Sequence, residues 1–121
     1  MPEMLQKYAD ITPYITLDGS EIRELMHPDV QGNSHQSLAE ATVHIGQKTK
    51  PHKHLTSEEI YHITSGTGLM TIETENFTVN QGDTVCIPPD RWHAIENTGT
   101  VPLVFLCCSS PAYRHDDTVL R

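Results

Sequence analysis

The sequence predicts an all-β domain, built either as a sandwich or as a closed barrel. Apolar and polar residues alternate in many short segments, as in residues 37–45, where Ala39, Ala41, Val43 and Ile45 share one face. Turn signals such as Ser65-Gly66 and Asn97-Thr98-Gly99 separate these segments at regular intervals. The chain has no amphipathic helix of useful length.

The same periodicity places the individual elements. The segment 28–34 carries proline, glycine and asparagine and is expected to form a loop. Strands are expected at residues 20–27, 37–45, 59–64, 68–73, 77–80, 84–88, 92–96 and 101–108.

Length and charge narrow the class of protein. The 121 residues are expected to form one domain, 1–121, with its barrel core at about 37–110. The net charge of −8 comes without a basic stripe, which argues against binding to nucleic acid or to an anionic membrane. The first seven residues lack a signal-peptide pattern, and no segment reaches transmembrane length, so the expected location is the cytoplasm.

A cluster of potential metal ligands lies in the middle of the chain. His52 and His54 are two residues apart, so on an extended segment their imidazoles leave the same face with origins roughly 6–7 Å apart. Glu59, near the start of the next strand, can add a carboxylate, and His93 further along is a fourth candidate. Imidazole nitrogens with an added carboxylate suit a first-row transition metal.

The residues around these ligands resemble the first motif of the cupin superfamily, which reads G-x5-H-x-H-x(3,4)-E-x6-G. Here Gly46 is followed by five residues, His52-Lys53-His54, four residues, Glu59, six residues and Gly66. Fifteen residues, 67–81, separate this motif from the next, as in small microbial cupins.

The second segment resembles the second cupin motif, G-x5-P-x-G-x2-H-x3-N. It runs from Gly82 through Pro88, Asp90 and His93 to Asn97. Asp90 stands where the family usually has glycine. Aspartate tolerates the left-handed backbone of such a turn, so this departure leaves the expected fold unchanged.

The resemblance implies a double-stranded β-helix, the jelly-roll barrel of cupins, around one divalent metal ion. His52, His54, Glu59 and His93 would hold iron, manganese, nickel, cobalt, copper or zinc, and the ligands alone do not choose among them. None of the three cysteines falls in this set, which argues against a structural zinc site. The family includes dioxygenases, oxalate decarboxylases and sugar-phosphate isomerases, so the fold does not settle the reaction.

Strand alternation suggests which residues surround the ion. If Glu59 faces the interior, Tyr61 and Ile63 do as well, whereas Glu58 and His62 face outward. Tyr61 is therefore a candidate for contact with the substrate. Arg91, two residues before His93, is expected at the mouth of the same cavity. A core aromatic and a solvated rim charge are the simpler alternatives for these two residues.

Several other residues are assigned weaker roles. Glu40 and His44 share the polar face of their strand, which lines either the pocket or the outer surface. The polar tail 110–117 is expected to wrap a neighbouring subunit of a homodimer. Three further histidines lack partners at ligand spacing and are expected on the surface: His27, His35 and His115. The three cysteines, Cys86, Cys107 and Cys108, are too few for a disulfide framework. The adjacent Cys107 and Cys108 are interpreted as small apolar side chains on opposite faces of a strand.

Two hypotheses follow. The first is a small metal-dependent enzyme, most simply a dioxygenase-type oxidoreductase, that acts on a compact anionic or oxygen-rich metabolite, with a lyase or a sugar-isomerase-like enzyme as the alternative. The second is a module that binds metal, a small acid or a sugar without turnover. A base beside an open coordination position would favour an enzyme, because proton transfer requires a group within hydrogen-bond reach.

Overall fold

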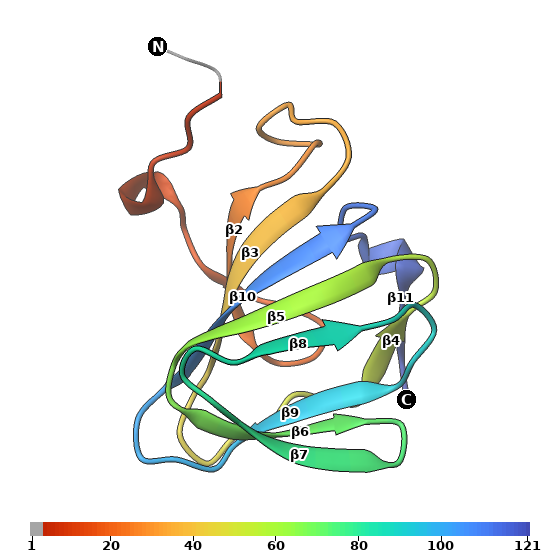
Figure 1. Cartoon of the computed structure of the whole chain (residues 1–121). Coiled ribbons are helices and arrows are strands. Elements are labelled where there is room, and N and C mark those ends of the chain that lie inside the picture. The colour runs from red at the N-terminus through yellow and green to blue at the C-terminus, as the bar shows by residue number, and fades with distance from the viewer. Residues whose placement is uncertain (1–3) are drawn as a thin grey trace.

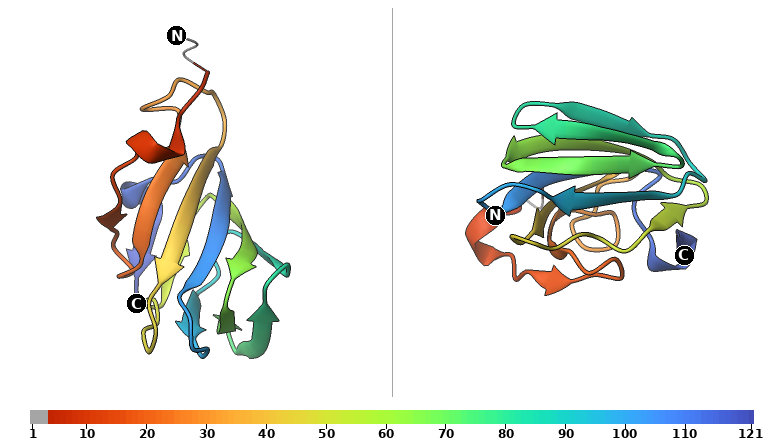
Figure 2. Two further views of the ribbon diagram at one scale, coloured as in Figure 1. Left: turned by 90° about the vertical axis from the view of Figure 1, so that its left-hand side faces the viewer. Right: turned by 90° about the horizontal axis from the view of Figure 1, so that it is seen from below.

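The computed structural model describes residues 4–121 and contains two antiparallel β-sheets (Figure 1). The six-stranded sheet has, in spatial order, β1 (Tyr14–Ile15), β2 (Glu21–Met26), β3 (Ser37–Val43), β10 (Leu103–Ser110), β5 (Glu58–Ser65) and β8 (Thr84–Ile87). The five-stranded sheet has β11 (Thr118–Leu120), β4 (His52–His54), β9 (His93–Asn97), β6 (Thr67–Ile72) and β7 (Glu75–Asn80). The left view of Figure 2 shows β2, β3, β10 and β5 side by side. The all-β jelly-roll prediction is confirmed.

Helical structure in the described part of the chain is limited to two short 3-10 turns, η1 (Tyr8–Asp10) and η2 (His115–Asp117). Within residues 4–121, no helix has the length and apolar character that crossing a membrane would require. The barrel is therefore built from strands and turns, as the periodicity indicates.

The expected strands are present with shifted ends. β3 ends at Val43, so Ile45 lies beyond it and is exposed rather than on the apolar face. β10 begins at Leu103 and continues to Ser110, because Ser109 and Ser110 pair with Glu59 and Glu58 of β5. Pairing with β5 decides where β10 ends. The alternation of apolar and polar residues within one strand does not contain this information. β1 and β11 were not expected.

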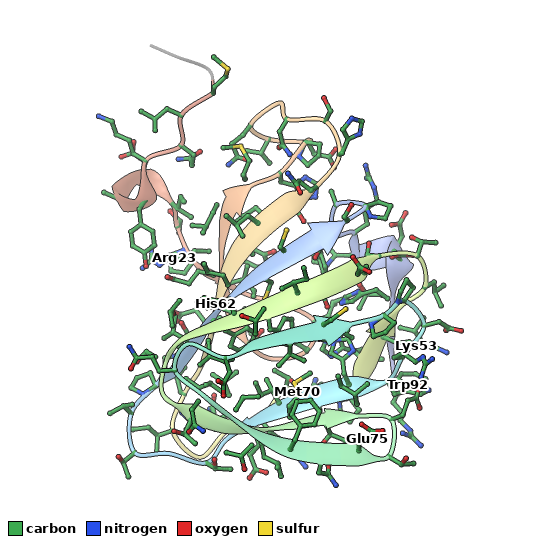
Figure 3. All side chains as sticks on the ribbon, in the orientation of Figure 1. Arg23, Lys53, His62, Met70, Glu75 and Trp92 are labelled. Atoms are coloured by element: carbon green, nitrogen blue, oxygen red, sulfur yellow. The ribbon has the colours of Figure 1, made fainter. Side chains whose placement is uncertain are left out.

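Alternation along β5 sets the interior of the barrel. Glu59, Tyr61 and Ile63 are buried, whereas Glu58 and His62 are exposed, as predicted. In Figure 3, His62 lies on the outer side of the sheet and Met70 lies between the sheets. The side chains buried most completely come from both sheets and form one core: Phe105, Ile63, Met70, Ile87, Ile95 and Leu103. This apolar core is the main source of stability.

The turn at Asp90 supports the motif assignment. Asp90 has a φ of 63°, so it adopts the left-handed conformation that glycine usually supplies at this position. Its backbone N–H donates to the His54 carbonyl at 2.7 Å, and its carboxylate lies 2.9 Å from the Lys53 ammonium. These contacts tie the turn before β9 to β4 and bring the two motifs together.

The C-terminal tail folds against its own barrel. Ala112 is buried, and β11 pairs with β4 along Thr118–Leu120. The tail therefore packs on this chain's own barrel, and its Tyr113 lines the cavity. Its expected contact with a neighbouring subunit stays a prediction. The homodimer itself stays a prediction.

His27 is buried, so the prediction that it lies on the surface is wrong. Its Nε2 lies 2.7 Å from the Tyr113 carbonyl, and its Nδ1 accepts the Asp29 N–H at 3.1 Å. Both ring nitrogens are satisfied by backbone groups, and the partners come from sequence positions that ligand spacing does not consider. His35 and His115 are exposed, as predicted.

Candidate metal centre

The four predicted ligands meet at one point in the interior. β4 contributes His52 and His54, β5 contributes Glu59, and β9 begins with His93. All four side chains are buried, and one potential ligand atom from each lies within 4.8 Å of the others. The direct pairing of His52 with His93 across β4 and β9 brings the two motifs into contact.

Backbone carbonyls orient two of the three imidazoles. His52 Nδ1 lies 2.8 Å from the Lys50 carbonyl, and His93 Nδ1 lies 3.0 Å from the Arg91 carbonyl. A carbonyl only accepts, so each Nδ1 carries the proton and each Nε2 presents its lone pair to the centre. Metal-binding histidines are commonly fixed in this way.

The third imidazole is held by the C-terminal strand. His54 Nδ1 lies 2.9 Å from the Thr118 hydroxyl oxygen, and this hydroxyl donates to the Arg114 carbonyl at 2.9 Å. Because its own proton is committed to Arg114, Thr118 accepts from His54 Nδ1–H. The Nε2 of His54 is thus also left free as a ligand atom.

Two buried polar atoms at the centre lack hydrogen-bond partners. These atoms are Glu59 Oε1 and His93 Nε2. His54 Nε2 comes within 2.7 Å of Glu59 Oε1, but the contact does not have the alignment of a hydrogen bond. Buried polar groups are rarely left unpaired, so the residues present fit a group that is drawn from outside the protein, such as a metal cation.

The charges at the centre are strongly coupled. Burial alone would raise the pKa of the Glu59 carboxyl, but contacts with His54 and His93 outweigh this effect and hold its pKa far below the usual range. Burial lowers the pKa of His54, yet the Glu59 carboxylate raises it by more. Burial and the neighbouring His93 lower the pKa of His52. An ionised carboxylate beside neutral imidazoles is the state that binds a divalent cation.

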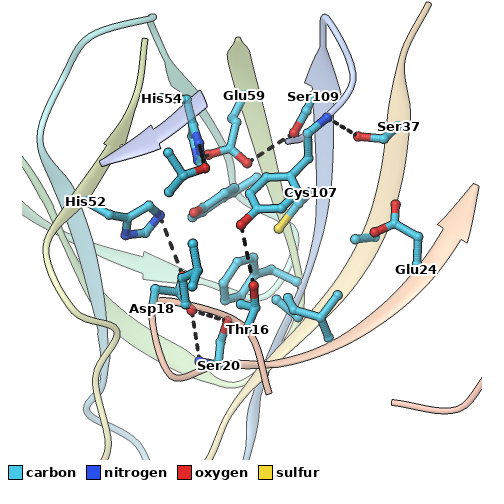
Figure 4. Close-up of a pocket in the computed structure, with 18 of the residues that line it drawn as sticks. Thr16, Asp18, Ser20, Glu24, Ser37, His52, His54, Glu59, Cys107 and Ser109 are labelled. Carbon is cyan, nitrogen blue, oxygen red and sulfur yellow. Dashed lines mark hydrogen bonds and ion pairs between the residues drawn. The ribbon is translucent and has the colours of Figure 1, made fainter. Parts of the chain in front are cut away.

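A cavity opens beside the cluster (Figure 4). Small inward side chains on two paired strands leave the space: Ser37, Ala39 and Ala41 on β3 and Cys107 and Ser109 on β10. Its volume for water-sized occupants is about 50 Å³. A single water needs roughly 10–15 Å³ by this measure, so the cavity accepts a ligand of a few heavy atoms.

Asp18 is a cavity residue that the sequence did not single out. It lies in the turn between β1 and β2, where its Oδ1 accepts from the Ser20 N–H and hydroxyl at 2.9 and 2.6 Å. Its Oδ2 lies 3.6 Å from His52 Nε2. The Asp-Gly-Ser turn was visible in the sequence, but only the folding of β1 and β2 over the cavity places it near the ligands.

Tyr61 lines the cavity, with its ring centroid 6.1 Å from that of His93. Burial, followed by the Glu59 charge, raises the pKa of the Tyr61 phenol well above its usual value. Arg91 is exposed and does not line the cavity, which corrects the expectation that it lies at the mouth. Arg91 contributes its backbone carbonyl to the site instead.

The remaining candidates lie on the outer surface or in the wall. Glu40 accepts a hydrogen bond from Tyr8 at 2.6 Å, and His44 lies 3.6 Å from Glu21, so their face of β3 is the outer one. All three cysteines are free; Cys86 is exposed, whereas Cys107 lines the cavity. Burial raises the pKa of the Cys107 thiol, which keeps it a neutral part of the wall.

Comparison with known proteins places this centre in a family. Residues 39–109 match the cupin domain, and the chain belongs to the cupin family. It is 59% identical over 112 residues to an uncharacterized protein of Methanocaldococcus jannaschii, and the match covers 93% of this chain and 90% of the relative. It is also 29% identical to an oxalate-binding protein of Thermotoga maritima, over 71% of each chain.

Other relatives are much longer than this chain. A mannose-1-phosphate guanylyltransferase of Salmonella muenchen is 31% identical over 66% of this chain, but the match spans 17% of the enzyme. Such a match concerns the cupin part alone, and the activity of the longer enzyme does not transfer with it.

Solved structures agree with the fold. A predicted oxalate decarboxylase from Thermotoga maritima superposes with a TM-score of 0.76 and 26% identity, over 89% of this chain and 99% of that one. Oxalate decarboxylase from Lactobacillus farciminis, in complex with formate, gives a TM-score of 0.80 at 23% identity, over 93% of this chain and 34% of that one.

Proposed function

We propose that this protein is a small metal-dependent enzyme that holds one divalent first-row ion and acts on a compact oxygen-rich acid. The observation that carries the proposal is the buried His52, His54, Glu59 and His93 cluster, with its two unpartnered atoms beside a cavity. Four protein ligands leave two positions open on a six-coordinate ion, or one if Glu59 binds through both oxygens. The absence of cysteine from this set separates it from a typical closed zinc site.

The size of the cavity supports a small acid over a sugar. About 50 Å³ suits an acid of a few heavy atoms, and a sugar phosphate needs several times that space. The named relatives agree, because they include an oxalate-binding protein and oxalate decarboxylases. The sugar-isomerase alternative has the weaker support.

Two reaction types remain for such a ligand. A bound ion of this kind would supply Lewis acidity and, where redox-active, electron transfer. Oxidation of the dioxygenase type is the first candidate, because the ligand set suits redox-active ions. A lyase that removes carbon dioxide is the second, favoured by the likeness to a predicted oxalate decarboxylase at 26% identity.

Two wall residues give the site the groups that an enzyme needs. The Asp18 Oδ2 faces the centre, 3.6 Å from His52 Nε2, where it can accept a proton from a bound ligand. The raised pKa of Tyr61 keeps its phenol protonated, so it would donate a hydrogen bond to a developing negative charge. A module that only binds does not require a base in this position.

Metal analysis followed by a substrate screen tests the proposal. Purified protein should contain close to one first-row ion per chain, and His54→Ala should remove it, whereas His62→Ala, on the outer face, should not. Metal-loaded protein is then screened with small keto acids, hydroxy acids, diketones and catechols, with dioxygen uptake and carbon dioxide release measured separately. Ligand binding without turnover on any ion would favour the binding module. The cytoplasmic location stays a prediction.

A further inference from the structure

The cavity has a second polar end, away from the metal cluster. Figure 4 shows the Glu24 carboxylate on the opposite side of the cavity from His52. Glu24 lies on β2, directly opposite Ala39 of β3, whose small side chain leaves open space in front of it. The carboxylate therefore faces the hollow and not a neighbouring side chain.

One oxygen of this carboxylate is unsatisfied. Glu24 Oε1 is buried and has no hydrogen-bond partner. Leaving a buried acceptor unpaired costs free energy, more so for a charged group, unless a partner arrives from outside. Burial accordingly raises the pKa of Glu24, although the neighbouring His27 opposes this effect.

Glu24 also lies where the cavity meets a wider hollow. A wider hollow lies outside the cavity, lined by residues of the β2–β3 region and the C-terminal tail, and Tyr14, Glu24 and Tyr113 line both spaces. A ligand that enters from this hollow passes Glu24 before it reaches the cluster. A ligand long enough to span the cavity from the cluster keeps its trailing end beside Glu24.

The charges of the wall restrict the ligand. Among the described residues that line the cavity there are three carboxylates, on Asp18, Glu24 and Glu59, and no lysine or arginine. Inside the cavity the metal ion would be the only fixed positive charge, because Arg114, which lines the outer hollow, pairs with Asp29 there. A ligand with a second carboxylate at its trailing end would place that negative charge against Glu24.

We propose that Glu24 is a specificity-determining residue, which selects ligands that chelate the ion at one end and present a hydroxyl or ammonium donor at the other. The preferred ligand class is thus a small hydroxylated or amino acid-like metabolite. A diacid that holds its second carboxylate at the trailing end is disfavoured, whereas oxalate, which chelates through both carboxylates, places no charge against Glu24. This inference rests on the proposed function, because it requires a metal that holds the chelating end.

A series of acids with one chelating end and four trailing groups tests the assignment. Lactate, glycerate, isoserine and tartronate share the α-hydroxy acid and carry a methyl, a hydroxymethyl, an aminomethyl and a carboxylate, respectively. Calorimetric titration of Zn²⁺-loaded protein should show isoserine binding roughly tenfold more tightly than lactate, as expected for a hydrogen bond to a charged group. Glycerate should fall between them, and tartronate should bind no more tightly than lactate.

The Glu24→Gln variant tests whether isoserine binds tightly because of Glu24 or because its amine chelates the metal ion. The variant should keep its metal, bring isoserine to within about twofold of lactate, and improve tartronate. Glu21→Gln is the matched control, because this carboxylate is on the same strand but pairs with His44 on the outer face. It should leave the preference unchanged.

The outcomes are distinct. The assignment of Glu24 is overturned if the preference for isoserine survives in Glu24→Gln. It is also overturned if all four acids bind in a metal-dependent way without any preference. In both cases the proposed function stands. Tighter binding of tartronate than of glycerate to the wild-type protein overturns it without any variant. If none of the four acids binds the metal-loaded protein, the assignment of Glu24 fails, and the proposed function is then decided by the metal analysis and the wider substrate screen.

Discussion

The two ends of the cavity differ in where their residues come from. All four candidate metal ligands lie within residues 39–109, the part of the chain that matches the cupin domain. Several other residues of the cavity wall come from outside this part: Tyr14, Asp18, Glu24, Tyr113 and Thr118. The matched region thus holds the candidate ligands, and the flanking segments complete the wall of the cavity beside them.

The two ends also differ in how completely their polar atoms are satisfied. At the metal end, every histidine Nδ1 has a fixed acceptor, and only the atoms directed at the centre are free. At the other end, Glu24 keeps an unpartnered oxygen. A preorganised end suits an ion with fixed geometry, and an end that lacks a partner suits a ligand that supplies one.

The largest expected effect comes from removing a ligand at the metal end. His54→Ala should lower metal affinity by more than about 100-fold and leave a folded barrel, because the apolar core and not the ion supplies most of the stability. Metal content by elemental analysis and far-UV circular dichroism check both statements.

His62→Ala is the control, since His62 is exposed on the outer face of the same strand as Glu59. Global unfolding of metal-free His54→Ala, with His62→Ala intact, would show that the site is structural.

A smaller effect tests whether the flanking tail supports the metal end. Thr118→Val removes the acceptor of His54 Nδ1–H, and we expect metal affinity to fall about 10-fold, within the usual range for such supporting residues. Thr118→Ser should restore it. Competition with a chromophoric chelator measures the change.

Thr84→Val is the matched control, because Thr84 makes the same kind of contact, 2.8 Å from His62 Nδ1, on the outer face. Equal metal affinities for wild type and Thr118→Val would remove the tail from the site and weaken the contrast between the two ends.

The sequence predicted the metal end far better than the opposite end. Alternation along one strand separates Glu59 from Glu58, and fixed motif spacing identifies the histidines, so local information is sufficient there. Glu24 becomes a cavity residue only through the pairing of β2 with β3, and Asp18 only through the contacts of the first turn with Lys50 and His52. Those are long-range contacts, which residue spacing does not contain.

The positions of Arg91 and of the C-terminal tail also depend on contacts that residue spacing does not contain. Its position two residues before His93 suggested that the Arg91 side chain faces inward, but the turn before β9 breaks the strand alternation, and only its carbonyl reaches the site. The polar composition of the tail indicated exposure. Most of the tail 110–117 is indeed exposed, but Tyr113 lines the cavity, and the next residues pair as β11 with β4.

The third prediction concerns pH and acts on the metal end alone. The pKa of His54 is raised above 6.5 in the metal-free protein, and a bound ion requires the neutral ring. Proton and metal therefore compete, and metal affinity should rise with pH up to the His54 pKa and level off above it. Below that pKa the affinity should fall about tenfold per pH unit.

Chelator competition between pH 6 and 9, corrected for protonation of the chelator, measures this slope. The same slope in Glu24→Gln would confirm that the two ends are independent. A flat profile through pH 6.5 would contradict the coupling of His54 to Glu59.

The smallest effect is expected at the other end, as a change in stability. The folded-state pKa of Glu24 is raised above 4.5, so folding favours its protonated form. The protonated carboxyl therefore adds to the free energy of unfolding below pH 4.5, and this contribution is lost as the pH rises through the folded-state pKa. Glu24→Gln does not titrate. At pH 7 it should therefore melt on the order of a few degrees above the wild type, and near pH 4.5 the difference should shrink.

Differential scanning calorimetry at both pH values, on metal-free protein, makes the comparison independent of ligand binding. Glu75→Gln, an exposed carboxylate on β7, should change the melting temperature much less at either pH. A destabilised Glu24→Gln at pH 7 would mean that the carboxylate has a favourable partner in the folded protein. In that case Glu24 would be a structural residue, and the two ends of the cavity would be equally satisfied before any ligand enters.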